Sequence, residues 1–280
     1  MASVTNNIDR KFSDLKTQQR AAFVTFITAG DPDQGTSLEI LKGLPAAGAD
    51  IIELGMPFTD PSADGPAIDK AAQRALAAGA SMAGTLEMVR AFRKTDQTTP
   101  LVLMGYFNPL YAYGIPAFCR DAGAAGVDGL IIVDLPPEED AELLAPANSA
   151  GIHLIRLATP TSDDSRLPAI VNGASGFLYY VAVAGVTGGK SATGDMISEA
   201  TRRIRRFSSL PIAVGFGIRT PVQVAEMAAR ADAAVVGSAI VSRIADNLDT
   251  NGKATKGLVA DTLDFVKKLA QGVATTRLTS

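Results

Sequence analysis

Residues 46–55 read AAGADIIELG, and this stretch decides the fold that we expect for the chain. It joins the small-residue end of a helical pattern to an aspartate, Asp50, and then to an apolar strand. Two later stretches repeat this order, AAGVDGLIIVD at 124–134 and AARADAAVVGSA at 228–239. Each repeat is typical of one helix-to-strand turn in a repeating α/β unit.

Apolar, β-rich segments run through the whole chain, with helical patterns between them. Most are continuous apolar runs, as expected for parallel strands covered on both faces. The eight segments begin at Ala21, Ala49, Pro100, Gly129, His153, Gly176, Pro211 and Ala233. We therefore predict an α/β fold, a single (β/α)8 TIM barrel domain over residues 1–280, with an extra N-terminal helix in roughly 1–18 and additional helices in roughly 245–280. A doubly wound open sheet is the alternative, but no G-x-G-x-x-G follows the first strand.

Composition and charge narrow the function classes. Of the 280 residues 47% are hydrophobic and 20% are charged, and the net charge is −3, a profile typical of a soluble globular protein. The one arginine-rich run, at 202–206, is interpreted as a solvated helix face, which disfavours nucleic-acid binding. No apolar run reaches the ~18 residues of a membrane span, and the first residues lack a signal-peptide core. The single cysteine, Cys119, lies in a helical pattern and is expected in the core. We expect a cytoplasmic protein.

Glu53 is a carboxylate in an otherwise apolar strand, near its C-terminal end. A structural role, paired with an arginine or with backbone groups, is one interpretation. A catalytic role is favoured because burial of an unpaired carboxylate raises its pKa. Such a group can both give and take a proton near neutral pH.

Other polar residues follow the predicted strands, where a barrel places its active site. Asp60 and Asp64 lie in TDPSADGP (59–66). Either aspartate could instead serve an ordinary turn, where Asp side chains bond to the nearby backbone. Asp134 is either a site residue or the cap of the helix that follows it. Asn108 and Tyr179 lie near the expected rim, where packing is an equally good explanation for each.

Three glycine-rich segments predict a phosphate site. They are AGVTGGKSATG at 184–194, GFGI at 215–218 and GSAI at 237–240. Glycine allows backbone N–H groups to approach an anion, and a helix N-terminus adds partial positive charge. The first segment is also typical of a mobile lid, with a plain surface loop as the alternative.

Absent residue types restrict the chemistry further. The one histidine, His153, begins a strand, far from the expected site, which disfavours a zinc enzyme. No lysine lies within the eight strands, which disfavours a Schiff-base aldolase. Carboxylate acid/base chemistry on a phosphorylated small molecule remains, with no metal. A barrel isomerase of triose or sugar phosphates and a non-enzymatic activator of a partner stay open as alternatives.

The motifs together resemble the α subunit of tryptophan synthase over roughly residues 10 to 245. They are FVTFITAGDP, DIIELGMPFTDPSADGP, MGYFNP, GLIIVDLP, AGVTG and GFGI, in the order and spacing of that family. The resemblance implies a TIM barrel and a carbon–carbon lyase. The implied reaction is the retro-aldol cleavage of indole-3-glycerol phosphate to indole and glyceraldehyde 3-phosphate.

The resemblance also implies roles for individual residues. Glu53 would transfer the protons, Asp64 would hold the indole N–H, and Tyr179 would position Glu53. The remaining expectations are Phe26, Met104, Tyr106 and Phe216 around the indole, Gly188, Gly217, Gly237 and Ser238 at the phosphate, and Thr187 closing over the site. This chain has Val183 where some members carry an arginine, so any pairing through that arginine is not expected here.

A partner follows from the same resemblance. The family works with a β subunit that carries pyridoxal phosphate and receives the indole, so this chain would need no cofactor of its own. The expected assembly is an α2β2 heterotetramer in the order αββα. Asp60 and Asn108 would face the β subunit.

Overall fold

The computed structural model describes residues 6–182, 194–215, 217–274 and 276. Within them, parallel strands form one sheet in the order β5-β4-β3-β2-β1-β9-β8-β7-β6. The strands are β1 (Ala22–Thr28), β2 (Ile51–Gly55), β3 (Leu101–Gly105), β4 (Gly129–Ile132), β5 (His153–Leu154), β6 (Arg156–Ala158), β7 (Leu178–Val181), β8 (Ile212–Gly215) and β9 (Ala233–Val236). All eight predicted segments contribute, and the predicted barrel is confirmed.

The strand predicted from His153 is divided, which corrects the prediction at this point. Its first part, β5, pairs with β4, and the Ile155 N–H donates to the Leu130 carbonyl at 2.9 Å. From Arg156 the chain pairs with β7 instead. The chain thus closes the barrel by pairing first with β4 and then with β7. After Ile155, β4 and β6 do not pair with each other.

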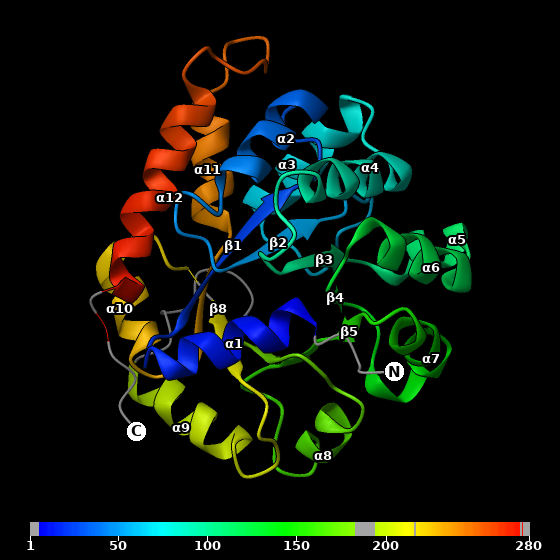
Figure 1. Cartoon of the computed structure of the whole chain (residues 1–280), viewed down its shortest axis with the longest axis vertical. Helices are drawn as coiled ribbons and strands as arrows, with labels where there is room; N and C mark the ends of the chain where they lie inside the picture. The colour runs from blue at the N-terminus through cyan, green and yellow to red at the C-terminus, as the bar shows by residue number, and fades with distance from the viewer. Residues whose placement is uncertain (1–5, 183–193, 216, 275, 277–280) are drawn as a thin grey trace.

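Helices surround the sheet (Figure 1). They are α1 (Asn7–Thr17), α2 (Gln34–Gly43), α3 (Pro66–Ala77), α4 (Met82–Arg93), α5 (Phe107–Tyr113), α6 (Ile115–Ala125), η1 (Pro137–Glu139), α7 (Ala141–Ser149), α8 (Leu167–Val171), α9 (Gly194–Ile204), α10 (Pro221–Ala228), α11 (Ser238–Asp246) and α12 (Leu258–Ala274). The last apolar segment is strand only as far as Val236, and its SAI residues begin α11.

Local sequence signals explain where several helices begin. Ser81 accepts a hydrogen bond from the Gly84 N–H at the start of α4. Thr220 and Gln223 form a capping box at the start of α10. Such caps satisfy N–H groups that have no partner inside the helix. Local sequence therefore defines where α4 and α10 begin.

The helix α1 closes the N-terminal end of the barrel. Its Ile8, Phe12 and Leu15 are buried and belong to the same apolar cluster as the inward-facing strand residues. The Phe12 and Phe177 rings lie 5.7 Å apart. Each large apolar side chain buried in this way contributes about 1.5–3 kcal/mol. The N-terminal end is thus part of the core, and only the C-terminal end remains for a site.

Three aspartates, which we call the strand-start aspartates, bind neighbouring strands together at this closed end. Each directly precedes a strand and accepts hydrogen bonds from an arginine and from a backbone N–H at the start of the adjacent strand. The contacts are Asp50 with Arg20 (2.7 Å) and Phe23 N (2.9 Å), Asp128 with Arg93 (2.6 Å) and Leu101 N (2.8 Å), and Asp232 with Arg205 (3.1 Å) and Ile212 N (2.8 Å). They are the aspartates of the three sequence repeats.

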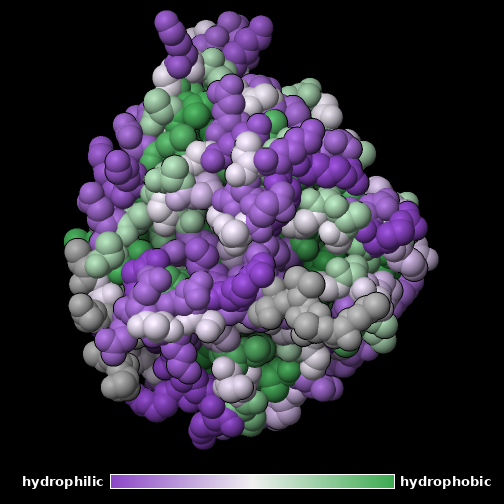
Figure 2. All heavy atoms as spheres, viewed as in Figure 1, coloured by the Kyte–Doolittle hydropathy of each residue, from purple (hydrophilic) through white to green (hydrophobic). Residues whose placement is uncertain are grey.

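The surface is predominantly hydrophilic on the face shown in Figure 2, with apolar residues in small separate groups. Among the described residues, no helix combines the length and the apolarity that a membrane crossing requires. Cys119 is buried in α6, in the core position that its helical pattern predicts.

Candidate active site

Glu53 points into the barrel because of the pleat of β2. Ile52 and Leu54 belong to the outer apolar layer beneath the helices, whereas Ile51 belongs to the inner cluster. Side chains two apart share a face of a strand, so Glu53 faces inward above Ile51. In the register of the sheet, Glu53 lies opposite Phe26 on β1 and Val102 on β3. Its side chain is buried, and the residue is 1% exposed.

The Glu53 carboxyl group has no cation beside it among the described residues. Its Oε1 is buried and makes no hydrogen bond there. Burial raises the pKa of Glu53 to about 8, because a charged carboxylate loses its hydration. The group is therefore mostly protonated at neutral pH and can act as an acid and then as a base.

Tyr179 faces Glu53 across the barrel interior. Burial, followed by the charge of Glu53, raises the pKa of Tyr179 well above its usual value, so the phenol keeps its proton. A Cβ at position 215 would overlap the Tyr179 hydroxyl, so Gly215 leaves the space that this ring needs. The structure brings these two predicted residues together.

Asp64 lies in the loop between β2 and α3, half-buried. Burial raises the pKa of Asp64 to about 6, a hydrogen bond from Tyr106 lowers it, and the charge of Asp69 raises it. The Tyr106 hydroxyl also accepts a hydrogen bond from the Ala63 N–H at 3.0 Å. Both carboxyl groups of the predicted pair thus have raised pKa values, but in different surroundings.

One cavity joins most of the predicted indole-contacting residues. Phe26, Met104, Tyr106 and Asp64 all line it, and Glu53 lies deeper along β2 than Gly55 in its wall. The wall also contains residues that were not predicted, among them Val133 and Thr28. Val133 follows β4, and Thr28 has a buried Oγ1 without a hydrogen-bond partner in the described part of the chain. A threonine near the end of an apolar strand was the available signal for Thr28.

The predicted phosphate residues lie at the same end of the barrel. Gly217 follows β8 with φ +61, a conformation that favours glycine. Gly237 caps α11, and Ser238 is its first residue. Gly237 packs against the Phe26 ring, since a Cβ there would lie 3.3 Å from Phe26 Cβ. Thr187, Gly188 and Phe216, as well as Val183, lie outside the described residues.

The two predicted partner-facing residues are on the outer rim. Asp60 is exposed and accepts a hydrogen bond from the Thr59 hydroxyl at 2.6 Å. Asn108 is exposed on α5, where Tyr111 is 63% exposed, and the Phe107 ring lies against Tyr111. An exposed aromatic residue of this size is typical of an interface.

Asp134 is a helix cap, but not of the helix that follows it, which was one of its two interpretations. Its carboxylate accepts a hydrogen bond from the Phe107 N–H at 2.8 Å, at the start of α5 on the preceding βα unit. The prediction that it caps the following helix is wrong, because the end of β4 lies beside the end of β3.

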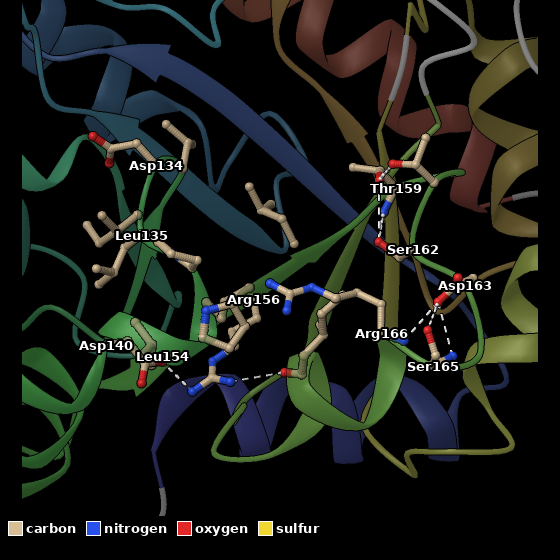
Figure 3. A pocket seen from close by; sticks show the side chains of 18 residues that line it. Asp134, Leu135, Asp140, Leu154, Arg156, Thr159, Ser162, Asp163, Ser165 and Arg166 are labelled. Atoms are coloured by element: carbon tan, nitrogen blue, oxygen red, sulfur yellow. Dashed lines mark hydrogen bonds and ion pairs between the residues drawn. The ribbon is translucent and has the colours of Figure 1, made fainter.

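A larger cavity lies elsewhere among the described residues, between the ends of β4 and β6. It has a volume of about 740 Å³ and is lined by the ends of these strands, by η1 and by α8. Figure 3 shows the Arg156 guanidinium turned toward Asp140 on one side, and Asp163 with Ser165 and Arg166 on the other. Arg156 forms a buried ion pair with Asp140, and Arg166 pairs with Glu138. Asp64 does not line this cavity. It lines the neighbouring cavity, which shares Val133 with this one and also contains the predicted aromatic residues, so we place the reaction there.

Comparisons with known proteins agree with this geometry. The family model described as tryptophan synthase alpha chain matches residues 12–272. Tryptophan synthase subunit alpha from Legionella pneumophila is 36% identical, with 97% of this chain and 99% of that chain covered and a TM-score of 0.88. A structure from Aquifex aeolicus is 34% identical, with 96% and 99% covered and a TM-score of 0.85. Tryptophan synthase from Mycobacterium tuberculosis, in an aminoacrylate-bound form, is 32% identical, with 96% and 100% covered and a TM-score of 0.84.

Proposed function

Because this chain belongs to the tryptophan synthase alpha chain family, we propose that Glu53 and Asp64 are the acid/base pair of that family's lyase reaction. The chain is a carbon–carbon lyase that cleaves indole-3-glycerol phosphate to indole and glyceraldehyde 3-phosphate. The observation that supports the two roles is the buried carboxyl group of Glu53, without a partner among the described residues, on the strand whose Gly55 lines the same cavity as Asp64.

Glu53 transfers both protons of the reaction. The protonated carboxyl group gives its proton to C3 of the indole, which becomes the cationic indolenine. The resulting carboxylate accepts the proton of the hydroxyl on the carbon attached to C3. The bond between that carbon and C3 then breaks, its electron pair returns to the ring, and an aldehyde forms. A pKa of about 8 supports this exchange, because both forms are accessible near neutral pH.

Asp64 stabilises the cation. As a carboxylate it accepts the ring N–H, and its negative charge opposes the positive charge that develops on the indolenine. A pKa of about 6 leaves it mostly ionised at neutral pH, whereas Glu53 is then mostly protonated. Two carboxyl groups with separated pKa values are what this division of roles requires.

The substrate's phosphate lies at the ends of β8 and β9 in this proposal. Gly217 and Gly237 present backbone N–H groups, and Ser238 lies at the N-terminus of α11, which favours an anion. Gly188 and Thr187 keep their expected roles in phosphate binding and closure. Phe26, Met104, Tyr106 and Phe216 enclose the indole, and Tyr179 positions Glu53.

Members of this family pair with a β subunit. We propose an α2β2 assembly in which Asp60 and Asn108 face the β subunit, next to the exposed Tyr111. The β subunit would carry pyridoxal phosphate, and the proton transfers described for this chain need no cofactor of its own. We expect the complex to act in the cytoplasm.

The test is an assay of indole-3-glycerol phosphate consumption by the chain with its β subunit. Glu53→Gln keeps the shape of the side chain and removes its proton transfer, so kcat should fall by about 10²–10⁴-fold. Near-normal turnover by Glu53→Gln would remove Glu53 from the mechanism.

Glu87→Gln is the matched control. Glu87 is an exposed carboxylate on α4 that pairs with Arg90, and its replacement should leave kcat unchanged. A separate binding measurement tests the substrate class. An indole-bearing phosphate analogue should bind, and glyceraldehyde 3-phosphate alone should bind much more weakly, since it cannot fill the aromatic cavity.

A further inference from the structure

Tyr106 makes a contact that its expected place beside the indole does not explain. Its hydroxyl accepts the Ala63 N–H at 3.0 Å and lies near enough to the Asp64 carboxylate to lower the pKa of that group. The residue is 3% exposed, so this hydroxyl is largely shielded from water. Tyr106 follows β3 directly and is the N-cap residue of α5. It therefore joins a rigid strand end to the loop that carries Asp64.

The loop has few other connections. Within the described residues, the remaining hydrogen bonds of residues 58–64 are made inside the loop itself. They are Thr59 to Asp60 (2.6 Å), Ser62 N to Asp60 O (2.9 Å) and Asp64 N to Pro61 O (3.1 Å). Packing of the Phe58 ring, 5.4 Å from the Tyr106 ring, adds an apolar contact to the same residue.

We propose that Tyr106 is a positioning residue, whose hydroxyl fixes the Ala63–Asp64 end of the β2–α3 loop and orients the Asp64 carboxylate toward the substrate. This inference rests on the proposed role of Asp64 in cleaving indole-3-glycerol phosphate. A loop carboxylate held by one rigid tyrosine keeps its geometry as charge develops on the ring.

The charged groups around Tyr106 and Asp64 make the effect of the Tyr106 hydroxyl measurable as a change in the pKa of Asp64. Asp69 on α3 faces Asp64, and the charge of Asp134 after β4 acts on Tyr106. Burial, opposed by the Ala63 N–H and followed by the charge of Asp64, raises the pKa of Tyr106 to about 12, so the hydroxyl remains a donor throughout the working range. Without this donor, burial and Asp69 act on Asp64 unopposed, and the pKa of Asp64 should rise above about 6.

The experiment compares Tyr106→Phe with Tyr113→Phe in the full chain. Tyr106→Phe keeps the ring and removes only the hydroxyl. Tyr113 donates to Asp121 at 2.8 Å at the far end of α5, so its replacement removes a similar tyrosine–aspartate bond away from the cavity. For Tyr106→Phe we expect kcat to fall about 10- to 100-fold, as for the loss of one bond to a charged group. KM should change less, and the acidic limb of the pH profile should move to higher pH.

Amide hydrogen exchange supplies a second readout that does not depend on activity. A peptide covering residues 58–64 should exchange about tenfold faster or more in Tyr106→Phe, and at the wild-type rate in Tyr113→Phe. An unchanged exchange rate, or a fall in kcat with an unmoved acidic limb, would overturn the positioning role. If the wild-type chain does not cleave indole-3-glycerol phosphate while exchange still responds, the proposed function fails and the contact to the loop stands.

Discussion

The strand-start aspartates and the carboxyl groups of the candidate site differ in their partners. At the closed N-terminal end, each strand-start aspartate accepts hydrogen bonds from an arginine and from a neighbouring strand. In the candidate site, Glu53 has no such partner among the described residues, and the side chain that lowers the pKa of Asp64 there is the neutral Tyr106 hydroxyl. The same backbone unit supplies both, since Asp50 and Glu53 are three residues apart.

The difference shows what burial does when partners are present and when they are absent. Burial raises the pKa of Asp128, but the charge of Arg93 and the Leu101 N–H act to lower it. No described group lowers the pKa of Glu53, which rises to about 8. The paired strand-start aspartates therefore join strands, and the buried Glu53 becomes available for proton transfer. At β2 these two roles lie three residues apart, at Asp50 and Glu53.

Removing a strand-start aspartate should produce the largest loss of stability. Asp128→Ala leaves Arg93, which is 7% exposed, without its carboxylate partner. Breaking a buried pair in this way costs about 3–5 kcal/mol. Urea unfolding should show this loss, while kcat of the folded fraction stays at the wild-type value. A fall in kcat with wild-type stability would contradict the difference between the two sets of carboxyl groups.

Removing the charge of Asp64 should have the opposite outcome. Asp64→Asn keeps the size of the side chain but loses the charge that stabilises the indolenine, so kcat/KM should fall about a hundredfold. Urea unfolding should change little, because Asp64 joins no strands. Steady-state kinetics and unfolding on the same preparation test both statements.

The unpaired carboxyl group should also make stability depend on pH. The pKa of Glu53 is raised in the folded state, from 4.5 to about 8. Between these values the unfolded chain has released a proton that the folded chain keeps, so stability falls as pH rises. Glu53→Gln removes this dependence. Its Tm relative to wild type should rise by several degrees from pH 5 to pH 8.5, whereas Glu87→Gln should show a constant difference. A constant Tm difference for Glu53→Gln would mean that Glu53 is hydrated or paired in solution.

The smallest effect is expected at the most exposed strand-start pair. The Arg205 side chain is 49% exposed and that of Asp232 is 28% exposed, so water and salt screen their attraction. Arg205→Gln should cost less than about 1 kcal/mol, well below the loss for Asp128→Ala. Equal losses at the two sites would show that burial does not set the strength of these pairs.

The site was predictable where a side chain's direction follows from the strand that carries it. Glu53 was singled out because it lies between apolar residues, and the pleat of β2 does turn it into the barrel. Phe26 and Met104 were expected only from the family resemblance, and they line the cavity from β1 and β3. The glycine pattern identified Gly217 and Gly237, which the structure places after neighbouring strands β8 and β9.

Contacts between different loops could not be predicted from the direction of a side chain on its own strand. The cap that Asp134 provides goes to α5, on the preceding βα unit, and the Tyr106 hydroxyl reaches back to the loop that follows β2. The division of the strand at Ile155, and the large cavity beside it, also had no local signal. Each depends on which residues of different βα units lie side by side.

The sequence by itself determined the repeating α/β unit, the barrel and the carboxylate that faces its interior, because hydrophobic period and strand pleat are local properties. Only the tertiary structure decided which carboxylates have partners. Asp50 meets Arg20 and Glu53 meets no described cation, although the two lie on the same short segment. The pKa of a buried group depends on its neighbours in space, and folding selects those neighbours from distant parts of the chain.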